Sequence, residues 1–269
     1  MPVSFNQRFR KHFPGLSRLA TRLEYDLLSA VDKRAEFTFL NYGYAALDDP
    51  PLPVDAESPY QARMYRHLAS SVDWAGKTVL EVGCGRGGGA HYLAQTFHPA
   101  VYTALDLSPR AIAFCRRRYT LPVLTFETGN AENLRFPDGS FDIVLNVESS
   151  LYYPHPEIFL AEVTRVLRPG GHFLYADLRY AEELTHWQAQ RARMPLMLCR
   201  EENLTSQVRL ALELDQARKQ ALIRQLIPSP FRIFFEDFSG MHQHAGLAAD
   251  PAAPRPRERV YLMFVYRKD

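Results

Sequence analysis

The chain has 269 residues, of which 46% are hydrophobic and 23% are charged, so it is long enough to bury a sizeable core. Its 32 basic and 30 acidic residues leave a net charge of only +2, which argues against a nucleic-acid-binding protein. Three widely spaced cysteines exclude a disulfide scaffold and a cysteine-rich zinc module, and no apolar run reaches the roughly 18 residues of a membrane span. The N-terminus lacks the apolar core of a secretory signal, so we expect a soluble cytoplasmic protein. His242 and His244 have no neighbouring ligand to complete a metal site, and no metal is expected.

Residues 1–75 are predicted to form an N-terminal helical cap. Apolar side chains recur at helical spacing from Phe5 to Leu19, and a second amphipathic stretch covers residues 23–40. The stretch up to Arg22 has five basic residues and no acid, which is typical of a solvated helix face or of a helix that rests on a membrane surface or an acidic partner. A proline-rich connection then precedes a third predicted helix, Gln61–Val72.

From Lys77 the pattern changes to short strands that alternate with helices. The predicted strands are Thr78–Val82, Val101–Leu107, Leu124–Thr128, Phe141–Asn146 and Gly171–Leu178. The predicted helices between them are Gly88–Phe97, Pro109–Tyr119 and Pro156–Leu167. This alternation predicts an α/β core with a doubly wound parallel sheet over residues 76–180.

The rest of the chain is expected to add a second cap and to complete the sheet. Residues 181–228 are polar with helical periodicity, and they predict an inserted helical cap that Pro228 closes. Residues 229–269 contain two predicted strands, Phe231–Phe238 and Val260–Arg267.

A glycine-rich turn, VLEVGCGRGGG from Val79 to Gly89, follows the first strand and opens a helix. Glycines suit a turn with positive φ and a close approach of ligand to backbone, but the pattern also satisfies the dinucleotide fingerprint GxGxxG. Glu81 stands two residues before the first glycine, and a carboxylate there would repel a pyrophosphate on the helix N-terminus. It suits a ligand with an amine and a sulfonium, which indicates S-adenosylmethionine.

Polar residues also follow the second and third strands. Asp106 could accept hydrogen bonds from both hydroxyls of a ribose, while Asp106 or Ser108 could instead cap the helix that begins at Pro109. The polar turn Gly129–Leu134 offers a place where an adenine amino group could be recognised.

Five segments, EVGCGRG, ALDLS, GNAENLRF, FDIVLNVESS and LRPGGHFLYAD, occur in an order that resembles the class I S-adenosylmethionine-dependent methyltransferases. The resemblance implies a Rossmann-like, mostly parallel seven-stranded sheet whose last strand, Val260–Arg267, is antiparallel. The flanking segments FLNYGY, HYLAQTFHPA, VESSLYYPH and VYLMFVYRKD are similar to the mycobacterial phthiotriolone/phenolphthiotriolone dimycocerosate methyltransferases and to O-methyltransferases that tailor natural products. That likeness is weakest over residues 180–258, where acceptor choice should reside.

The resemblance also implies which residues bind the cofactor. Residues 81–85 would border its methionine end, Asp106 would hold the ribose, and residues 130–132 would close over the adenine that Leu107 flanks. Asn146 would contribute backbone contacts near the sulfonium, and Tyr44 either closes the pocket from above or is a core aromatic. The expected cofactor-binding residues are Tyr44, Glu81, Gly83, Cys84, Gly85, Asp106, Leu107, Asn130, Ala131, Glu132 and Asn146.

Transfer to an alcohol benefits from a base that takes the hydroxyl proton. Several members of the family have a histidine where this chain has Leu151. The candidate catalytic residues are therefore Glu148, which lies nearest the end of the fourth strand, and His155, which titrates near neutral pH. Asp177 is a third candidate base, and an enol or phenol acceptor would need little base help.

We expect an enzyme that O-methylates a hydroxyl of a small lipid or polyketide-like molecule and releases S-adenosylhomocysteine. C- or N-methylation, a nicotinamide-dependent oxidoreductase and an inactive cofactor-binding partner remain as alternatives. The expected partner is a small-molecule acceptor and not nucleic acid, since the sequence has no interleaved basic and aromatic residues of an RNA-binding module.

Overall fold

A computed structural model describes residues 15, 37–48, 58–226, 232, 246–255 and 257–269 of the chain. The basic N-terminal stretch, the predicted strand at 231–238 apart from Arg232, and the two histidines of the predicted loop lie outside the described residues. Residues 37–40 form no regular secondary structure, so the second amphipathic stretch does not continue as a helix to residue 40.

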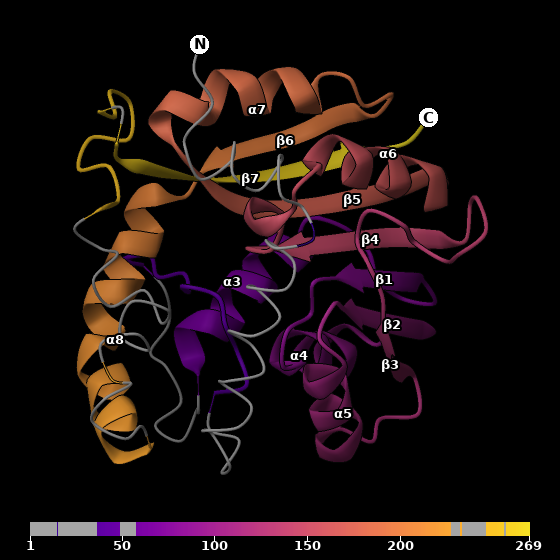
Figure 1. The fold of residues 1–269 in the computed structure, drawn as a ribbon, viewed down its shortest axis with the longest axis horizontal. Coiled ribbons are helices and arrows are strands. Elements are labelled where there is room, and N and C mark those ends of the chain that lie inside the picture. Colours follow the sequence, from indigo (N-terminus) through magenta and orange to yellow (C-terminus); the bar gives the residue numbers. More distant parts are fainter. Residues whose placement is uncertain (1–14, 16–36, 49–57, 227–231, 233–245, 256) are drawn as a thin grey trace.

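Seven strands form one sheet with the order β3-β2-β1-β4-β5-β7-β6 (Figure 1). Strands β1 to β5 run parallel, and β7 lies antiparallel between β5 and β6. The predicted fold class is therefore confirmed, including the antiparallel last strand. The strands are β1 Thr78–Val82, β2 Val101–Asp106, β3 Leu124–Thr128, β4 Phe141–Val147, β5 Leu167–Tyr180, β6 Met197–Asn203 and β7 Arg259–Arg267.

Strand β6 contradicts the prediction that residues 181–227 are helical throughout. Its sequence, MLCREEN, is largely exposed along its whole length, so it has none of the apolar alternation by which a half-buried strand is recognised. The backbone pairing with β7 holds this edge strand in the sheet. The helical part of the segment consists of α7, Leu184–Arg191, and α8, Thr205–Leu226.

Helices cover both faces of the sheet (Figure 1). Side chains of α3 (Pro59–Ala69), α4 (Gly88–Phe97), α5 (Pro109–Arg118) and α8 belong to one apolar cluster, and those of α6 (Pro156–Val166) and α7 belong to the other. Two short 3-10 turns, η1 (Ser150–Tyr152) and η2 (Ala181–Glu183), complete the described elements. In the part of the chain that the structure describes, no helix has the length and apolarity to cross a membrane.

Helices α3 and α8 lie beside the carboxyl ends of the parallel strands (Figure 1). The Ala45 amide donates to the Gln207 carbonyl at 3.2 Å, which ties the N-terminal segment to α8. The Tyr261 amide of β7 donates to Thr205 Oγ1 at 3.0 Å, at the start of α8. Ligands of open α/β sheets bind at the carboxyl ends of the strands, so these helices border the expected site.

Candidate functional site

The glycine turn after β1 touches the end of β4. Gly83 has a φ of 81°, and a Cβ there would lie 2.2 Å from Ser149 Oγ. Both the left-handed backbone and the close contact require glycine at this position. The turn and the residues after β4 are therefore held together as one wall of the site.

Most backbone donors of the turn are used within the protein. The amides of Gly83 and Cys84 donate to the Leu105 carbonyl at 2.8 and 3.0 Å, and the amide of Gly85 donates to Asp106 Oδ2 at 2.9 Å. A pyrophosphate is bound by free amides at such a turn. These three amides already have partners within the protein, so they are not available to bind a pyrophosphate.

The N-terminal segment covers the start of α4. The Gly88 amide donates to the Thr38 carbonyl at 3.1 Å, and a Cβ on Gly88 would lie 2.6 Å from that same oxygen. Thr38 thus occupies the place at the helix N-terminus where a dinucleotide phosphate would sit. This geometry disfavours NAD and leaves room for a ligand without phosphates.

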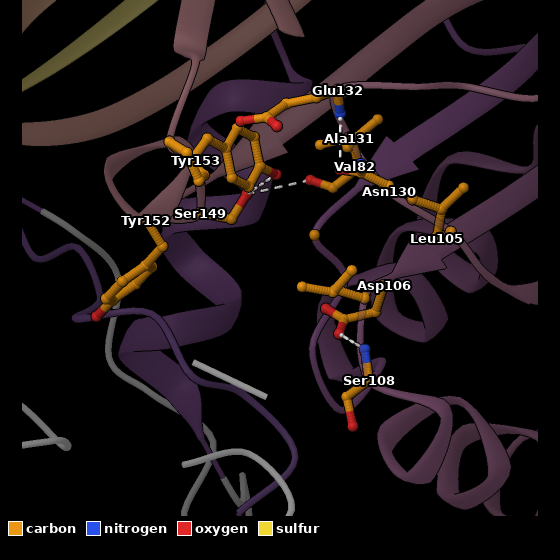
Figure 2. Close-up of a pocket in the computed structure, with 14 residues that line it drawn as sticks. Val82, Leu105, Asp106, Ser108, Asn130, Ala131, Glu132, Ser149, Tyr152 and Tyr153 are labelled. Carbon is orange, nitrogen blue, oxygen red and sulfur yellow. Dashed lines mark hydrogen bonds between the residues drawn. The ribbon is translucent and has the colours of Figure 1, made fainter. Parts of the chain in front are cut away.

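A larger pocket opens between the ends of β1 to β4 (Figure 2). Its empty volume of ≈ 620 Å³, which includes its open mouth, is in the usual range for small-molecule sites. Figure 2 shows Tyr152 and Tyr153 on the opposite side of the pocket from Leu105 and Asp106. Besides Gly83, five predicted cofactor-binding residues line this pocket, namely Asp106, Leu107, Asn130, Ala131 and Glu132. Its full lining is Val82, Gly83, Leu105, Asp106, Leu107, Ser108, Gly129, Asn130, Ala131, Glu132, Ser149, Tyr152, Tyr153 and Pro154.

Asp106 borders this pocket from the tip of β2. Its Oδ1 accepts from the Ser108 amide at 2.9 Å, and burial raises the pKa of the carboxyl to about 6 although backbone hydrogen bonds oppose the rise. Ser108 is the N-cap of α5, because its Oγ accepts from the Ala111 amide at 3.1 Å. The capping alternative is confirmed for Ser108, while Asp106 supports the turn and faces the pocket.

The turn after β3 is rigidly built. Asn130 Oδ1 accepts from the Glu132 amide at 3.0 Å, and Glu132 Oε1 accepts from the His155 amide at 2.7 Å. The backbone of His155 is thereby tied to the Glu132 side chain, while its Nδ1 lies 3.6 Å from a carboxylate oxygen of Glu157. Its side chain lines neither this pocket nor the smaller cavity described next.

A smaller cavity shares Gly83 and Ser149 with the larger pocket, so the two meet there. Its empty volume is ≈ 370 Å³. It is lined by Thr38, Phe39, Leu40, Asn41, Tyr65, Gly83, Cys84, Gly85, Gly89, Val147, Glu148 and Ser149. Sequence reasoning found residues 83–85 and 148 of this set but not residues 38–41.

Glu148 follows β4 in a left-handed conformation, with a φ of 50°. Such a backbone costs about 1–3 kcal/mol and persists only where the surroundings enforce it. Glu148 Oε1 accepts from the Tyr42 amide at 2.9 Å and from the Tyr261 hydroxyl at 3.0 Å, while no described residue donates to Oε2. Burial raises the pKa of this carboxyl to about 8.

Asn41 also borders the smaller cavity. Its Nδ2 donates to the Gln61 carbonyl at 3.2 Å, and its buried Oδ1 has no hydrogen-bond partner among the residues that the structure describes. An unpaired buried acceptor is costly unless a ligand supplies the donor. The acceptor oxygen of Asn41 beside this cavity fits a ligand end that carries an ammonium.

Glu81 lies beneath the turn and not in either cavity. It is completely buried, and the hydroxyls of Tyr65 and Tyr102 donate to its two oxygens at 2.9 and 2.8 Å. Burial raises the pKa of Glu81 to about 7, and the two tyrosine hydrogen bonds oppose the rise. Of these residues, Tyr65 reaches the smaller cavity, so Glu81 faces that cavity only through Tyr65.

Two other predicted cofactor residues line neither cavity. The Tyr44 ring stacks on His67 of α3, with 4.4 Å between centroids. Asn146 is fully buried behind the wall of the site, where its Nδ2 donates to the Val82 carbonyl at 2.8 Å and to Ser149 Oγ at 2.7 Å. Of the two, Asn146 supports the site through its bond to Ser149, which lines both cavities.

Asp177 is held in a buried network and is not placed to act as a base. It pairs with Arg179 at 3.1 Å and accepts from the Leu151 amide at 3.0 Å. Its side chain is fully buried and lines neither cavity.

Comparisons with known proteins agree with this geometry. Residues 80–175 match the family described as a methyltransferase domain. The chain is 44% identical over 225 residues to the phthiotriol/phenolphthiotriol dimycocerosates methyltransferase of Mycobacterium tuberculosis, an alignment that covers 82% of this chain and 83% of the relative. The chain belongs to the class I S-adenosylmethionine-dependent methyltransferases. The oxidoreductase that the glycine pattern left open is thereby excluded.

Further similarities extend over most of the methyltransferase. It is 40% identical over 228 residues to the fatty-acid O-methyltransferase of Mycolicibacterium smegmatis, covering 83% of this chain and 82% of the relative. A putative sarcosine dimethylglycine methyltransferase from Galdieria sulphuraria has the same fold, with a TM-score of 0.68 at 15% identity over 91% of this chain and 98% of that one.

Proposed function

We propose that this methyltransferase transfers a methyl group to a hydroxyl oxygen of a lipid or polyketide-like molecule, with Glu148 as the general base. The observation that carries the proposal is the position of Glu148 beside the junction of the two cavities. One of its oxygens is anchored by two hydrogen bonds, and no residue in the described part of the chain donates to the other. Two relatives are named for lipid acceptors, phthiotriol dimycocerosates and fatty acids.

The two cavities fit the two ends of the cofactor. The adenosine would occupy the larger pocket, with its ribose on Asp106 and its adenine beside Asn130 and Leu107. The methionine end would occupy the smaller cavity, where the Oδ1 of Asn41 has no partner within the described part of the chain. Bound S-adenosylmethionine supplies an electrophilic methyl on its sulfonium and leaves as S-adenosylhomocysteine.

The residues of the chain would align the acceptor and remove its proton. Alignment of the acceptor oxygen with the methyl lowers the entropic part of the barrier. Glu148 Oε2 would take the hydroxyl proton in its ionised form, and because the pKa of this carboxyl is about 8, we expect turnover to rise as pH increases toward that value. His155 is a poorer candidate because it lines neither cavity.

Methyl transfer to two acceptors of equal chain length tests this function. Hexadecan-1-ol needs a base, whereas palmitate is already ionised and does not. We expect Glu148→Gln to lower kcat for the alcohol by about 10²–10⁴-fold and to leave the dissociation constant of S-adenosylmethionine unchanged. Palmitate methylation, if it occurs, should not depend on Glu148.

His155→Ala is the matched control and should lose less than about tenfold. An unchanged kcat for the alcohol in Glu148→Gln would show that Glu148 is not the base. Failure of the parent enzyme to methylate either acceptor would contradict the lipid-acceptor assignment.

We also propose a cytoplasmic location, because Cys84, Cys115 and Cys199 are all free thiols. Disulfide bonds between these cysteines in the cell would contradict the cytoplasmic location.

The basic stretch up to Arg22 suits contact with the membrane surface from which a lipid acceptor would come. The full chain should then sediment with phosphatidylglycerol vesicles, and a chain without residues 1–22 should remain in the supernatant. A full chain that stayed in the supernatant in the presence of the vesicles would contradict the membrane contact.

A further inference from the structure

Tyr261 of β7 approaches Glu148 from a distant part of the chain. The two residues are 113 positions apart in sequence, and the Tyr261 hydroxyl lies 3.0 Å from Glu148 Oε1. Strand β5 lies between β4 and β7, and Tyr261 is paired with Leu178 of β5. The phenol therefore reaches the site across the neighbouring strand.

The position of Tyr261 is fixed by its own backbone. Its side chain is completely buried. Its amide donates to Thr205 Oγ1 at 3.0 Å, and its carbonyl accepts from the Leu204 amide at 2.9 Å. A hydroxyl on such a rigid base can hold a carboxylate in one orientation.

The Tyr42 amide donates to the same oxygen, Oε1, at 2.9 Å. Both donors therefore act on one side of the carboxylate. Glu148 itself is held by its own amide, which donates to the Ala176 carbonyl at 2.8 Å and keeps the left-handed backbone in place. Among the described residues, the carboxylate therefore has donors on Oε1 and none on Oε2.

We propose that Tyr261 is a positioning residue, whose hydroxyl holds Glu148 Oε1 so that Oε2 is the atom that receives the acceptor's proton. The inference rests on the proposed function. In the step concerned, the acceptor O–H bond breaks and its proton bonds to Oε2, while the acceptor oxygen forms a bond to the methyl carbon. The carbon–sulfur electron pair goes to sulfur, and the proton is later released to solvent.

Hydrogen bonding by Tyr261 also affects when Glu148 is ionised. The hydroxyl stabilises the charged form, so it lowers a pKa that burial raises to about 8. In the described part of the chain, the charged and titratable groups that interact with Glu148 include Tyr42, Tyr65, Asp177, Lys219 and Tyr261. Of these, Asp177 raises and Lys219 lowers the pKa of Glu148. Removal of the hydroxyl should therefore raise the pKa of Glu148 further.

The titration of Glu148 can be measured without any acceptor. We would label the full-length enzyme with [δ-13C]glutamate, assign the Glu148 carboxyl by its absence from Glu148→Gln, and follow its 13C shift from pH 6 to 10. Tyr261→Phe should move the titration midpoint upward by about one pH unit, because a hydrogen bond to a charged group is lost. The acid limb of the pH profile for hexadecan-1-ol should move by the same amount, with activity recovered at high pH.

Tyr266→Phe is the matched control, since its hydroxyl lies on the same strand and accepts from Arg191 instead. Tyr261→Met provides a second variant without the donor in case Tyr261→Phe does not fold, and it should shift the midpoint in the same direction.

An unchanged midpoint in a folded Tyr261 variant would overturn the positioning role. A merely structural role would instead lower activity equally at all pH values. A Glu148 carboxyl that did not titrate between pH 6 and 10 in the parent, together with full activity of Glu148→Gln, would contradict the proposed base itself, so the two failures are distinguishable.

Discussion

Asp106 connects the glycine turn to the larger pocket. One carboxylate oxygen accepts from the Gly85 amide and the other from the Ser108 amide, and the side chain still borders the pocket. A carboxylate fixed in this way is preorganised to accept from ribose hydroxyls. Its removal should affect binding more than folding of the sheet.

We predict that Asp106→Ala weakens the binding of S-adenosylmethionine and S-adenosylhomocysteine by about 10–100-fold, the equivalent of about 1.5–3 kcal/mol for hydrogen bonds to a charged group. Isothermal titration calorimetry measures this directly. Asp138→Ala, at an exposed carboxylate, should bind both molecules like the parent. Equal dissociation constants for parent and Asp106→Ala would remove Asp106 from the ribose site.

Single residues near the turn were predictable where the chemistry lies within one motif. Asp106 and Asn130 stand at strand ends, and the parallel sheet brings such positions to one edge. Asn41 and Tyr261 were not predictable, because each joins the site through residues that are distant in sequence: Asn41 lines a cavity with Gly83, and Tyr261 contacts Glu148, 113 positions away. The sequence places Glu81 at the carboxyl end of β1, but it does not show that the hydroxyls of Tyr65 and Tyr102 bond to both of its oxygens.

Helices α3 and α8 are linked to the smaller cavity through Gln61. Asn41 donates to the Gln61 carbonyl, and Gln61 Nε2 donates to Asp215 Oδ2 of α8 at 2.9 Å. Arg218 binds the same carboxylate, with its Nε 2.6 Å from Oδ1. A ligand that contacts Asn41 would thus influence α8 through a continuous set of hydrogen bonds.

We predict that S-adenosylhomocysteine slows tryptic cleavage of α8, at Arg209, Arg218 and Lys219, because an ordered lid exposes its backbone less often. Gln61→Ala removes the side-chain bond to Asp215 but keeps the backbone carbonyl that Asn41 uses, so it should abolish the protection with little change in ligand affinity. Gln95→Ala, at an exposed position of α4, should retain the protection. Cleavage of the parent at the same rate with and without ligand would show that α8 is not a lid.

The elements of the central sheet follow closely from their sequence, whereas β6 does not. Strands β1 to β4 are short apolar runs between turn residues, and the predicted and observed bounds differ by no more than one residue. Strand β6 has no such pattern because it lies at the sheet edge with largely exposed side chains. Only its pairing with β7, which is distant in sequence, makes it a strand.

The folded molecule buries carboxyls that retain their protons at unusually high pH. Burial raises the pKa of Asp106 to about 6, of Glu81 to about 7 and of Glu148 to about 8. In an unfolded chain these groups titrate near pH 4. Between these values the folded state binds more protons than the unfolded state, so these groups make stability fall as pH rises.

We predict that Glu148→Gln makes the free energy of unfolding less dependent on pH than in the parent, by up to about 1.4 kcal/mol per pH unit between pH 5 and 8. The sign follows because the stabilising proton on Glu148 is lost as pH rises through its folded pKa. Urea unfolding at pH 5.5, 7 and 8.5 measures the difference, and Glu213→Gln, at an exposed residue of α8, should behave like the parent. Parallel stability curves for Glu148→Gln and the parent would contradict the raised pKa.

At the scale of the whole molecule, we propose that a single cofactor spans both cavities and passes the place where Gly83 and Ser149 meet. A crystal structure of the enzyme with S-adenosylhomocysteine tests it most directly. We predict adenine beside Asn130, ribose hydroxyls on Asp106, the amino-acid end in the cavity of Asn41, and sulfur on the side that Glu148 Oε2 faces. A ligand bound in the reverse direction, or with its sulfur remote from Glu148, would contradict the account.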